Sequence, residues 1–256
     1  YPDLPSRRTA LHKVCRALNW ELTNAPRSAP QLIIRFEDQT EKETALPEWL
    51  LKSSRTIWNL QCTDIRKSTL EKAHKTSFGY GMSVDELVHS GPMVVKSERN
   101  AQHDGRTIEG PIAPQDQQTD AVYQIDIQNV DEAGRHFDYR LVYIRGNIPL
   151  AYRKYKAKST RFTNVCETAD TVETTQALTA EELRSTERMM HLLHVDYAEL
   201  DALRDAESGK LYVIDVNPTP WGPPSELSDE EKSMAIQTMA RAFAHALKDE
   251  TPSNKP

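Results

Sequence analysis

The chain has 256 residues and a formal net charge of −6, and 27% of its residues are charged. This length accommodates one large domain or two small ones with a real hydrophobic core. A nucleic-acid binder usually has a clustered basic excess, and a membrane span needs about 20 apolar residues in a row. The sequence shows neither feature, so we expect neither nucleic acid nor a membrane as a partner.

Cysteine usage bears on the cellular compartment. The three cysteines, Cys15, Cys62 and Cys166, are odd in number and widely spaced. This spacing fits neither a disulfide framework nor a zinc site, so we expect reduced thiols. With no secretory signal pattern, these features predict a cytoplasmic protein. An upstream segment is left open, because Tyr1 is not a natural first residue.

The first 62 residues are predicted to form a short α/β lobe. Four elements are expected in it, a helix, a strand, a helix and a strand, over residues 6–20, 31–36, 47–54 and 56–62. Leu11, Val14 and Leu18 follow helical spacing in the first of them. The order strand, helix, strand is typical of a small α/β unit.

In the middle of the chain, the sequence pattern predicts one helix and several strands. The helix covers 64–80, a strand from 91 runs into a polar loop that ends at 106, and further strands lie within 120–130 and 135–157. Turns are expected at 132–134 and at 147–149, where "NIP" would reverse the chain. The loop before 106 has one glycine, Gly105, although a phosphate-cradling loop usually needs several.

The last 80 residues show the clearest helix signals. Thr179 and Glu182 form a capping-box pattern that predicts a helix over 179–194, and Ser228 with Glu231 predicts another over 229–248. Between these helices, residues 197–205 and 211–217 are predicted to pair as a β-hairpin. Residues 249–256 are expected to be a disordered tail.

Polar residues interrupt the second strand of this hairpin. Asp215 and Asn217 lie two apart in "LYVIDVN", so their side chains share one face of the strand. Asp201 lies at the corresponding place on the first strand, so the three side chains can gather their oxygens. Carboxylate and amide oxygens suit Mg²⁺. These residue types also form turns ahead of prolines, which is the alternative role, and the opposed Asp201 favours the metal site.

The run "ELDALRDAESGKLYVIDVNPTPWGPP" resembles the closing hairpin of the ATP-grasp superfamily. Proteins of this family carry an Asp on one strand, then an acidic residue, one spacer and an Asn on the next. The resemblance implies that Asp201, Asp215 and Asn217 hold Mg²⁺ against the phosphates of ATP. The second carboxylate is more often Glu in the family, whereas here it is Asp215.

The resemblance also implies a fold. It is of the α+β class, with two α+β lobes whose antiparallel sheets clasp a nucleotide, preceded by a short α/β segment. The small lobe would span residues 63–125, and the large lobe, with the metal site, residues 126–248. The match covers about residues 60–248 and is poor for the first 60 residues.

Further site residues follow from the order of parts in the family. Residues that the resemblance implies for nucleotide binding are Lys67 on the first helix, Lys96 at a strand end, Gln124 and Asp126 at the adenine hinge, Asp138 near the ribose, and Asn164. Residues implied for catalysis are Arg140, Lys154 and Arg161, which bring positive charge to developing negative charge. A solvated strand-end lysine or a solvated basic strand is the alternative reading of Lys96 and of residues 152–164.

Three functions remain open from the sequence. The family base rate favours a ligase that activates a carboxylate as an acyl-phosphate for attack by an amine, with small-molecule substrates and with ATP and Mg²⁺ as cofactors. A small-molecule or sugar kinase with the same ATP site is the alternative, and a non-catalytic nucleotide-binding module is a third reading. A homodimer also stays open, because dimers are common in such enzymes. The sequence does not identify the substrate.

Overall fold

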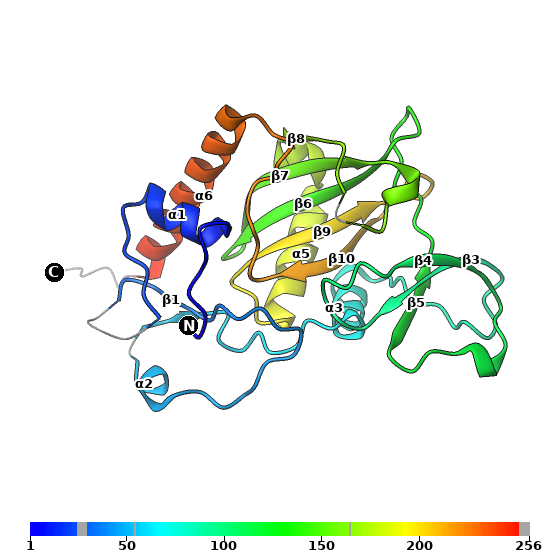
Figure 1. Cartoon of the computed structure of the whole chain (residues 1–256), viewed down its shortest axis with the longest axis horizontal. Coiled ribbons are helices and arrows are strands. Elements are labelled where there is room, and N and C mark those ends of the chain that lie inside the picture. The colour runs from blue at the N-terminus through cyan, green and yellow to red at the C-terminus, as the bar shows by residue number, and fades with distance from the viewer. Residues whose placement is uncertain (25–29, 54, 164, 251–256) are drawn as a thin grey trace.

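A computed structural model describes residues 1–24, 30–53, 55–163 and 165–250 of the chain. Within these residues the strands form a large sheet, a small sheet and a two-stranded ribbon (Figure 1). The large sheet contains, in spatial order, β10 (Leu211–Asn217), β9 (Tyr197–Arg204), β6 (His136–Ile144), β7 (Asn147–Lys156) and β8 (Thr168–Val172). All adjacent strands of this sheet pair in antiparallel orientation. Antiparallel sheets with helices packed on them make an α+β protein, as the sequence predicts.

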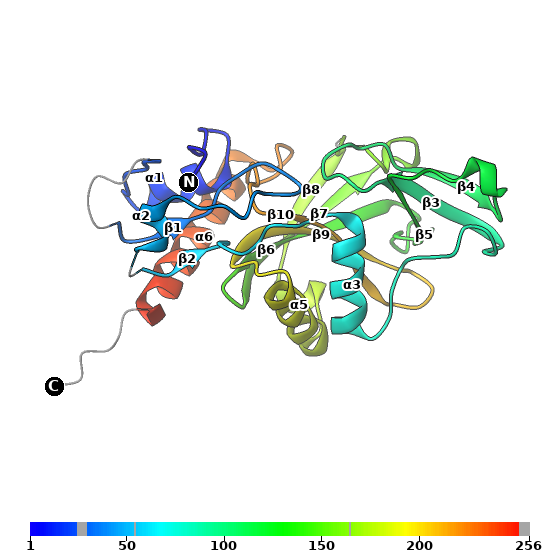
Figure 2. The ribbon, with the colours of Figure 1, turned by 90° about the horizontal axis from the view of Figure 1, so that it is seen from below.

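Helices cover the two faces of the large sheet unequally (Figure 2). On one face, α3 (Lys67–Phe78) and α5 (Ala180–Leu192) share a core with strand residues such as Leu141 and Leu200. On the other face, α6 (Asp229–Glu250) and α1 (Ala10–Ala17) pack only over one end, against residues such as Val142 and Tyr197. The uncovered end of this second face carries the charged residues of the candidate site.

The small sheet is a separate lobe with its own core. It contains β3 (Gly91–Ser97), flanked by β4 (Arg106–Gly110) and β5 (Ala121–Ile125), and the turn η1 (Pro114–Asp116) precedes β5. Met93, Val95 and Tyr123 form the centre of its core. A bridging cluster around Met82 and Ile127 joins this lobe to the β10 edge of the large sheet.

The amino-terminal segment is less regular than predicted. Its strands β1 (Ile33–Ile34) and β2 (Ile57–Trp58) pair in parallel over two residues each, and α2 (Glu48–Leu51) is a single turn. The buried ring of Trp58 packs on Phe243 of α6 with centroids 5.3 Å apart. The segment therefore shares its core with the large lobe.

Several predicted boundaries need correction. The helix α3 was assigned to the small lobe, yet Leu70 and Ala73 lie in the core of the large sheet, because its apolar stripe faces α5 and β10. The β6–β7 turn is at Arg145–Gly146, not at 147–149, because both residues have the positive φ angles that a tight hairpin needs. Helix α6 includes residues 249 and 250 of the predicted tail, and 251–256 lie outside the described residues.

Some of the remaining elements were not predicted from the sequence, and others were. The strands β4 and β8, the short helix α4 (Thr174–Ala177) and the turn η2 (Lys158–Thr160) were not predicted. Helix α1 is shorter than predicted and begins after Thr9, which caps it. Both capping boxes are confirmed, at Thr179–Glu182 and at Ser228–Glu231. No helix in the described ranges has the length and apolarity of a bilayer span.

Candidate active site

The β9–β10 hairpin brings the predicted carboxylates together. Asp215 lies directly opposite Asp201 in the ladder, and Asn217 lies opposite Glu199, so the four side chains share one face. The register shifts between Val213 and Asp215, where Ile214 is an extra residue. This bulge lets both Ile214 and Asp215 line the same cavity, which a regular two-residue alternation would forbid.

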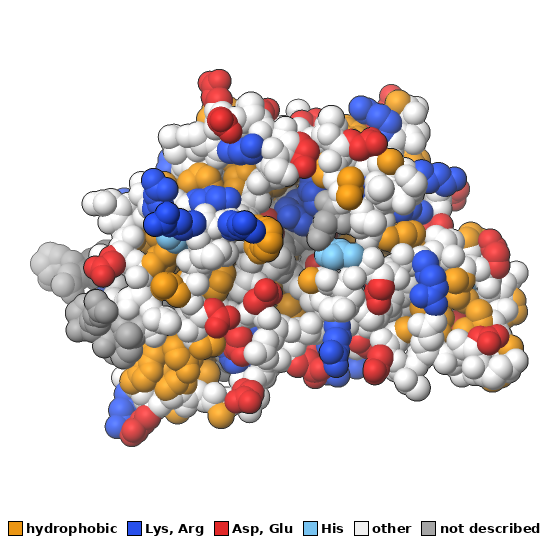
Figure 3. Space-filling view, in the orientation of Figure 1, with side chains coloured by type: hydrophobic (Ala, Val, Ile, Leu, Met, Phe, Trp, Pro, Cys, Tyr) orange, Lys and Arg blue, Asp and Glu red, His pale blue; other side chains and the backbone are white. Residues whose placement is uncertain are grey.

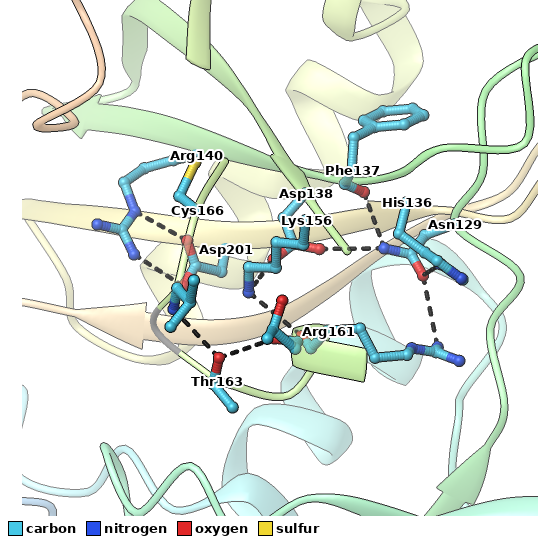
Figure 4. Close-up of polar contacts among 12 residues, drawn as sticks. Asn129, His136, Phe137, Asp138, Arg140, Lys156, Arg161, Thr163, Cys166 and Asp201 are labelled. Atoms are coloured by element: carbon cyan, nitrogen blue, oxygen red, sulfur yellow. Dashed lines mark hydrogen bonds and ion pairs between the residues drawn. The ribbon is translucent and has the colours of Figure 1, made fainter. Parts of the chain in front are cut away.

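Each of the two aspartates is held by a cation of the protein itself. Arg140 on β6 donates two hydrogen bonds to Asp201, of 2.9 and 3.1 Å (Figure 4). Lys67, at the start of α3, pairs with Oδ1 of Asp215. Burial alone would raise the pKa of Asp201, but Arg140 and Lys154 outweigh it and hold that pKa well below its usual range.

The donor set at this end fits a hard divalent cation. Its atoms are carboxylate and amide oxygens, the ligands that Mg²⁺ takes, and none is sulfur or imidazole nitrogen. As the side chains are now placed, no group of three His, Cys, Asp or Glu residues suited to a metal occurs in the described ranges, so the predicted triad uses the amide of Asn217 as its third member. Its Oδ1 accepts a hydrogen bond from the backbone N–H of Thr219 at 2.9 Å, which fixes the amide orientation.

Glu199 is a fourth acidic residue at this place, and the sequence reasoning missed it. Its side chain is 1% exposed, and within the described residues neither carboxylate oxygen has a hydrogen-bond partner. The nearest cation is Arg140, whose Nη1 lies 3.7 Å from Oε2. Burial raises the pKa of Glu199 to about 7. The signal was present in the sequence, because Glu199 precedes Asp201 by two residues and shares its face.

A cavity of about 150 Å³ extends from this hairpin to the small lobe. One end is apolar, with walls of Val94, Ile125, Ile127, Leu203 and Ile214. The other end is charged, and the predicted residues that line the cavity are Lys67, Lys96, Gln124, Asp138, Lys154, Arg161, Asp201 and Asp215. On the face drawn in Figure 3, basic side chains gather over α1 and the adjoining part of the large sheet.

Two lysines of the cavity have lowered pKa values. Burial, together with the nearby cation Lys67, lowers the pKa of Lys96 to about 7, although Asp215 opposes the shift. Burial also lowers the pKa of Lys154, against the attraction of Asp201. A lysine that has lost its water is stabilised by an incoming anion, so both positions favour a phosphate or carboxylate group nearby.

A polar network closes the cavity on the side of the β6–β7 hairpin (Figure 4). Lys156 pairs with Asp138 at 2.6 Å, and Asn129 donates a hydrogen bond to the same carboxylate at 3.0 Å. Arg161 pairs with Asp126 at 3.0 Å and donates to the backbone oxygen of Ile127. Asn129 is almost fully buried and follows no motif, so no sequence pattern marks it.

Not every predicted residue reaches the cavity wall. Asp126, Arg140 and Asn217 do not line it in the present conformation, although each contacts or neighbours a lining residue. The side chain of Asp126 is turned toward Arg161, and its role at an adenine hinge stays a prediction. The predicted Asn164 lies outside the described residues.

A second, larger hollow of about 1070 Å³ lies elsewhere on the molecule, between β2 and α5. Its lining mixes apolar residues such as Leu51 and Leu192 with His191, His194 and Arg145. None of the predicted site residues lies in it. We therefore assign the chemistry to the smaller cavity, where carboxylates and cations converge.

Comparison with known proteins identifies the fold. No protein-family model matches the sequence, and no curated protein does. Among solved structures, the ATP-grasp ligase PsnB in complex with a minimal precursor matches with a TM-score of 0.54 at 13% identity, over 88% of this chain and 81% of that one. The chain therefore has the ATP-grasp fold, two α+β lobes with a cavity between them.

Two further ligases resemble the chain more distantly. D-alanine–D-alanine ligase from Bacillus anthracis, complexed with ATP, has a TM-score of 0.48 at 14% identity and covers 75% of this chain and 70% of its own. The D-cycloserine synthetase DcsG has a TM-score of 0.46 at 14% identity, over 72% and 70% of the two chains.

Proposed function

We propose that this protein is a Mg²⁺- and ATP-dependent ligase that activates a carboxylate as an acyl-phosphate for attack by an amine. The observation that carries the proposal is the pairing of Asp201 with Asp215 at one end of a cavity whose other end is apolar. An apolar slot accommodates a planar base, cationic walls accommodate phosphates, and paired carboxylates accommodate a divalent cation. The shared fold with the ligase PsnB supports the same assignment.

The proposed roles follow the layout of the cavity. Asp201, Asp215 and Asn217 would hold Mg²⁺, which when bound supplies positive charge to the phosphate oxygens. The residues proposed to bind the nucleotide directly are Lys67, Lys96, Gln124 and Asp138. Asp126 is proposed to act through Arg161, and nucleotide binding by Asn164 stays a prediction. Arg140, Lys154 and Arg161 are proposed to neutralise the charge of the transferred phosphoryl group.

Loading this site requires local rearrangement. Lys67 and Arg140 now balance the charges of Asp215 and Asp201, so a divalent cation has to displace them. Arg140 then retains Glu199 as a carboxylate partner on its other side. A cavity of about 150 Å³ is also smaller than the roughly 300–1,000 Å³ of most ligand pockets, so the lobes or the loop above must open to admit ATP.

The reaction needs no protein nucleophile. A carboxylate oxygen of the substrate attacks the terminal phosphorus of ATP, the bond to ADP breaks, and an acyl-phosphate forms. The amine then attacks the acyl carbon, the amine proton leaves, and phosphate departs as the amide bond forms. Positioning and charge neutralisation by the lysines and arginines of the cavity supply the catalysis.

The test is ADP release with Mg²⁺ and ATP against pooled carboxylic acids and amines, with peptides included because PsnB was solved with a minimal precursor. We expect release to need both a carboxylate and an amine, and Asp215→Ala to abolish it. Asp170→Ala is the matched control, because Asp170 is also paired with an arginine of the large sheet, Arg153, but lies outside the cavity.

Other outcomes would replace the proposal. ADP release with a sugar or alcohol and no amine would make the protein a kinase. Mg²⁺-dependent protection by ATP against thermal unfolding, with no turnover on any pool, would make it a nucleotide-binding module. Protection that survives unchanged in Asp215→Ala would place the nucleotide elsewhere in the molecule.

A further inference from the structure

The loop between β3 and β4 lies over the charged end of the cavity. Residues 99–105 of this loop all line the cavity. The loop is tied at several points: the backbone oxygen of Glu98 accepts a hydrogen bond from the N–H of Lys67, and Asn100 donates its own N–H to Thr40. Gly105 lies against Phe162, where a Cβ would come within 3.0 Å of the ring. The loop therefore has a defined conformation across the two lobes.

Part of the backbone of the loop and of the residues just before it is already engaged. The N–H groups of Ser97, Glu98, Asn100 and Ala101 donate to side-chain or backbone oxygens of the protein itself. A loop that cradles phosphate usually does so with backbone N–H groups, which glycines leave accessible. Since Asn100 and Ala101 of the loop, and Ser97 and Glu98 before it, already use their backbone donors, and the loop has one glycine, we expect side chains to contribute to anion binding.

Two residues of the loop adopt a conformation that costs energy. Ala101 has φ 58° and His103 has φ 52°, in the left-handed region that a residue with a Cβ adopts at a cost of about 1–2 kcal/mol. Such conformations persist where the surroundings fix them, and they concentrate at functional sites. Both residues line the cavity, so His103 is held in its wall.

The surroundings of His103 identify which part of the cavity it faces. The charged groups that act on its imidazole are Asp215, Lys156, Asp201 and Lys67. These residues belong to the metal end of the cavity rather than to the apolar slot. Burial, with Lys156 and Lys67, lowers the pKa of His103 despite the two aspartates, so the ring is mostly neutral at neutral pH and still carries one N–H donor.

We propose that His103 donates its imidazole N–H to the terminal phosphoryl group of bound ATP, in place of the backbone donors of a glycine-rich loop. The inference rests on the proposed function, because it requires ATP in this cavity with its phosphates toward Asp201 and Asp215. It assigns to His103 a contact that ATP offers and ADP lacks. His103 is then the residue by which the loop distinguishes the two nucleotides.

The experiment compares the affinities of two nucleotides by calorimetry, Mg²⁺ with AMPPNP and Mg²⁺ with ADP. In His103→Gly we expect AMPPNP to bind about tenfold more weakly or worse, the effect of one hydrogen bond to a charged group, and ADP to bind within about twofold of wild type. Added imidazole should restore part of the AMPPNP affinity, and His103→Gln, which keeps an N–H donor, should retain part of it.

Two control variants separate the side chain from the backbone. Ala101→Gly relieves the neighbouring positive φ without removing a donor, so the ratio of the two affinities should not change. His194→Gly makes the same chemical change at another left-handed histidine, φ 54°, which lines the other hollow, and should change neither affinity.

The outcomes distinguish this inference from the function on which it rests. A wild-type protein that binds neither nucleotide with Mg²⁺ would overturn both. A wild-type protein that binds both, with His103→Gly weakening AMPPNP and ADP equally or not at all, would overturn the role of His103 and leave the proposed function standing.

Discussion

The two faces of the large sheet are built from the same strands and have opposite characters. On β9, Ala198, Leu200 and Ala202 point toward α3 and α5 and are fully buried among apolar side chains. The residues between them, Glu199 and Asp201, point the other way into a concentration of charge. Beyond the end covered by α1 and α6, one face serves stability and the other serves the site, and a two-residue period keeps them apart.

The difference shows why the charged face can exist at all. Charges withdrawn from water destabilise a fold unless they are paired, and Arg140 and Lys67 pair those of Asp201 and Asp215. The helices and the apolar face behind them supply the burial that offsets this cost. Substitutions on the two faces should therefore have separable effects on stability and on nucleotide binding.

The largest effect is expected from Arg140→Met, which leaves Asp201 and Glu199 near each other without their main cation. Breaking a buried ion pair by removing one partner costs about 3–5 kcal/mol, so urea unfolding should show a loss of that order. Arg153→Met is the control, because Arg153 pairs with Asp170, which is 43% exposed, and should cost about 1 kcal/mol or less. Equal costs for the two variants would contradict the burial argument.

Leu200→Ala tests the opposite face at the residue beside Asp201. Leu200 is 0% exposed and packs in the core between the sheet and the helices, so truncation should cost about 3 kcal/mol. The affinity for Mg²⁺ with AMPPNP, measured well below the unfolding temperature, should stay within about twofold of wild type, since the strand keeps its register. Leu192→Ala, at an exposed position of α5, should change stability by less than about 0.5 kcal/mol. A loss of nucleotide affinity in Leu200→Ala as large as that in a charged-face variant would show that the faces are coupled.

The same alternation explains how much was predictable. Asp201, Asp215 and Asn217 were placed from the sequence because antiparallel pairing and a two-residue period fix which side chains meet. The β9–β10 hairpin and the capped helices α5 and α6 followed from equally local signals.

What escaped prediction depends on contacts between distant parts of the chain. The assignment of α3 to the wrong lobe, the missed β4 and β8, and the burial of Glu199 and Asn129 all arise from such packing. The bulge at Ile214 has no sequence signature, although it sets which residues line the cavity.

His74 gives the apolar side a pH dependence. It is fully buried on α3 among Phe78, Tyr80 and Tyr212, and within the described residues neither ring nitrogen has a hydrogen-bond partner. Burial lowers its pKa from 6.5 to about 4, so between these values the unfolded chain binds a proton that the folded protein does not.

Protonation of His74 in the unfolded chain lowers the free energy of unfolding as the pH falls from 6.5 toward 4, by about 3 kcal/mol in all. Above pH 6.5 this loss is absent. His74→Phe, which keeps an aromatic ring in the cluster, should remove this pH dependence. The difference in stability between variant and wild type should then grow in favour of the variant as the pH falls from 6.5 to 4. A constant difference over that range would show that His74 titrates normally.

Asn217→Ala should have the smallest effect and is the sharpest test of the charged face. An amide contributes less to a divalent cation than a carboxylate does, so we expect AMPPNP to need about tenfold more Mg²⁺ for half-saturation, with little change in stability. Thr219→Val is the control, because it removes a hydroxyl that donates to Asn217 Oδ1 at 3.2 Å and leaves the backbone donor in place. This control variant should not weaken the binding of Mg²⁺.

Asn217 and Glu199 compete for the place of third ligand, since they face each other across the ladder beside the Asp201–Asp215 pair. Glu199 is turned toward Arg140 in the present arrangement, which favours Asn217. If Asn217→Ala binds Mg²⁺ like wild type while Glu199→Gln binds it tenfold more weakly, the ligand set is Glu199, Asp201 and Asp215. The released Arg140 would then turn toward the phosphates or toward Asp138, which lies two residues away on the same face of β6.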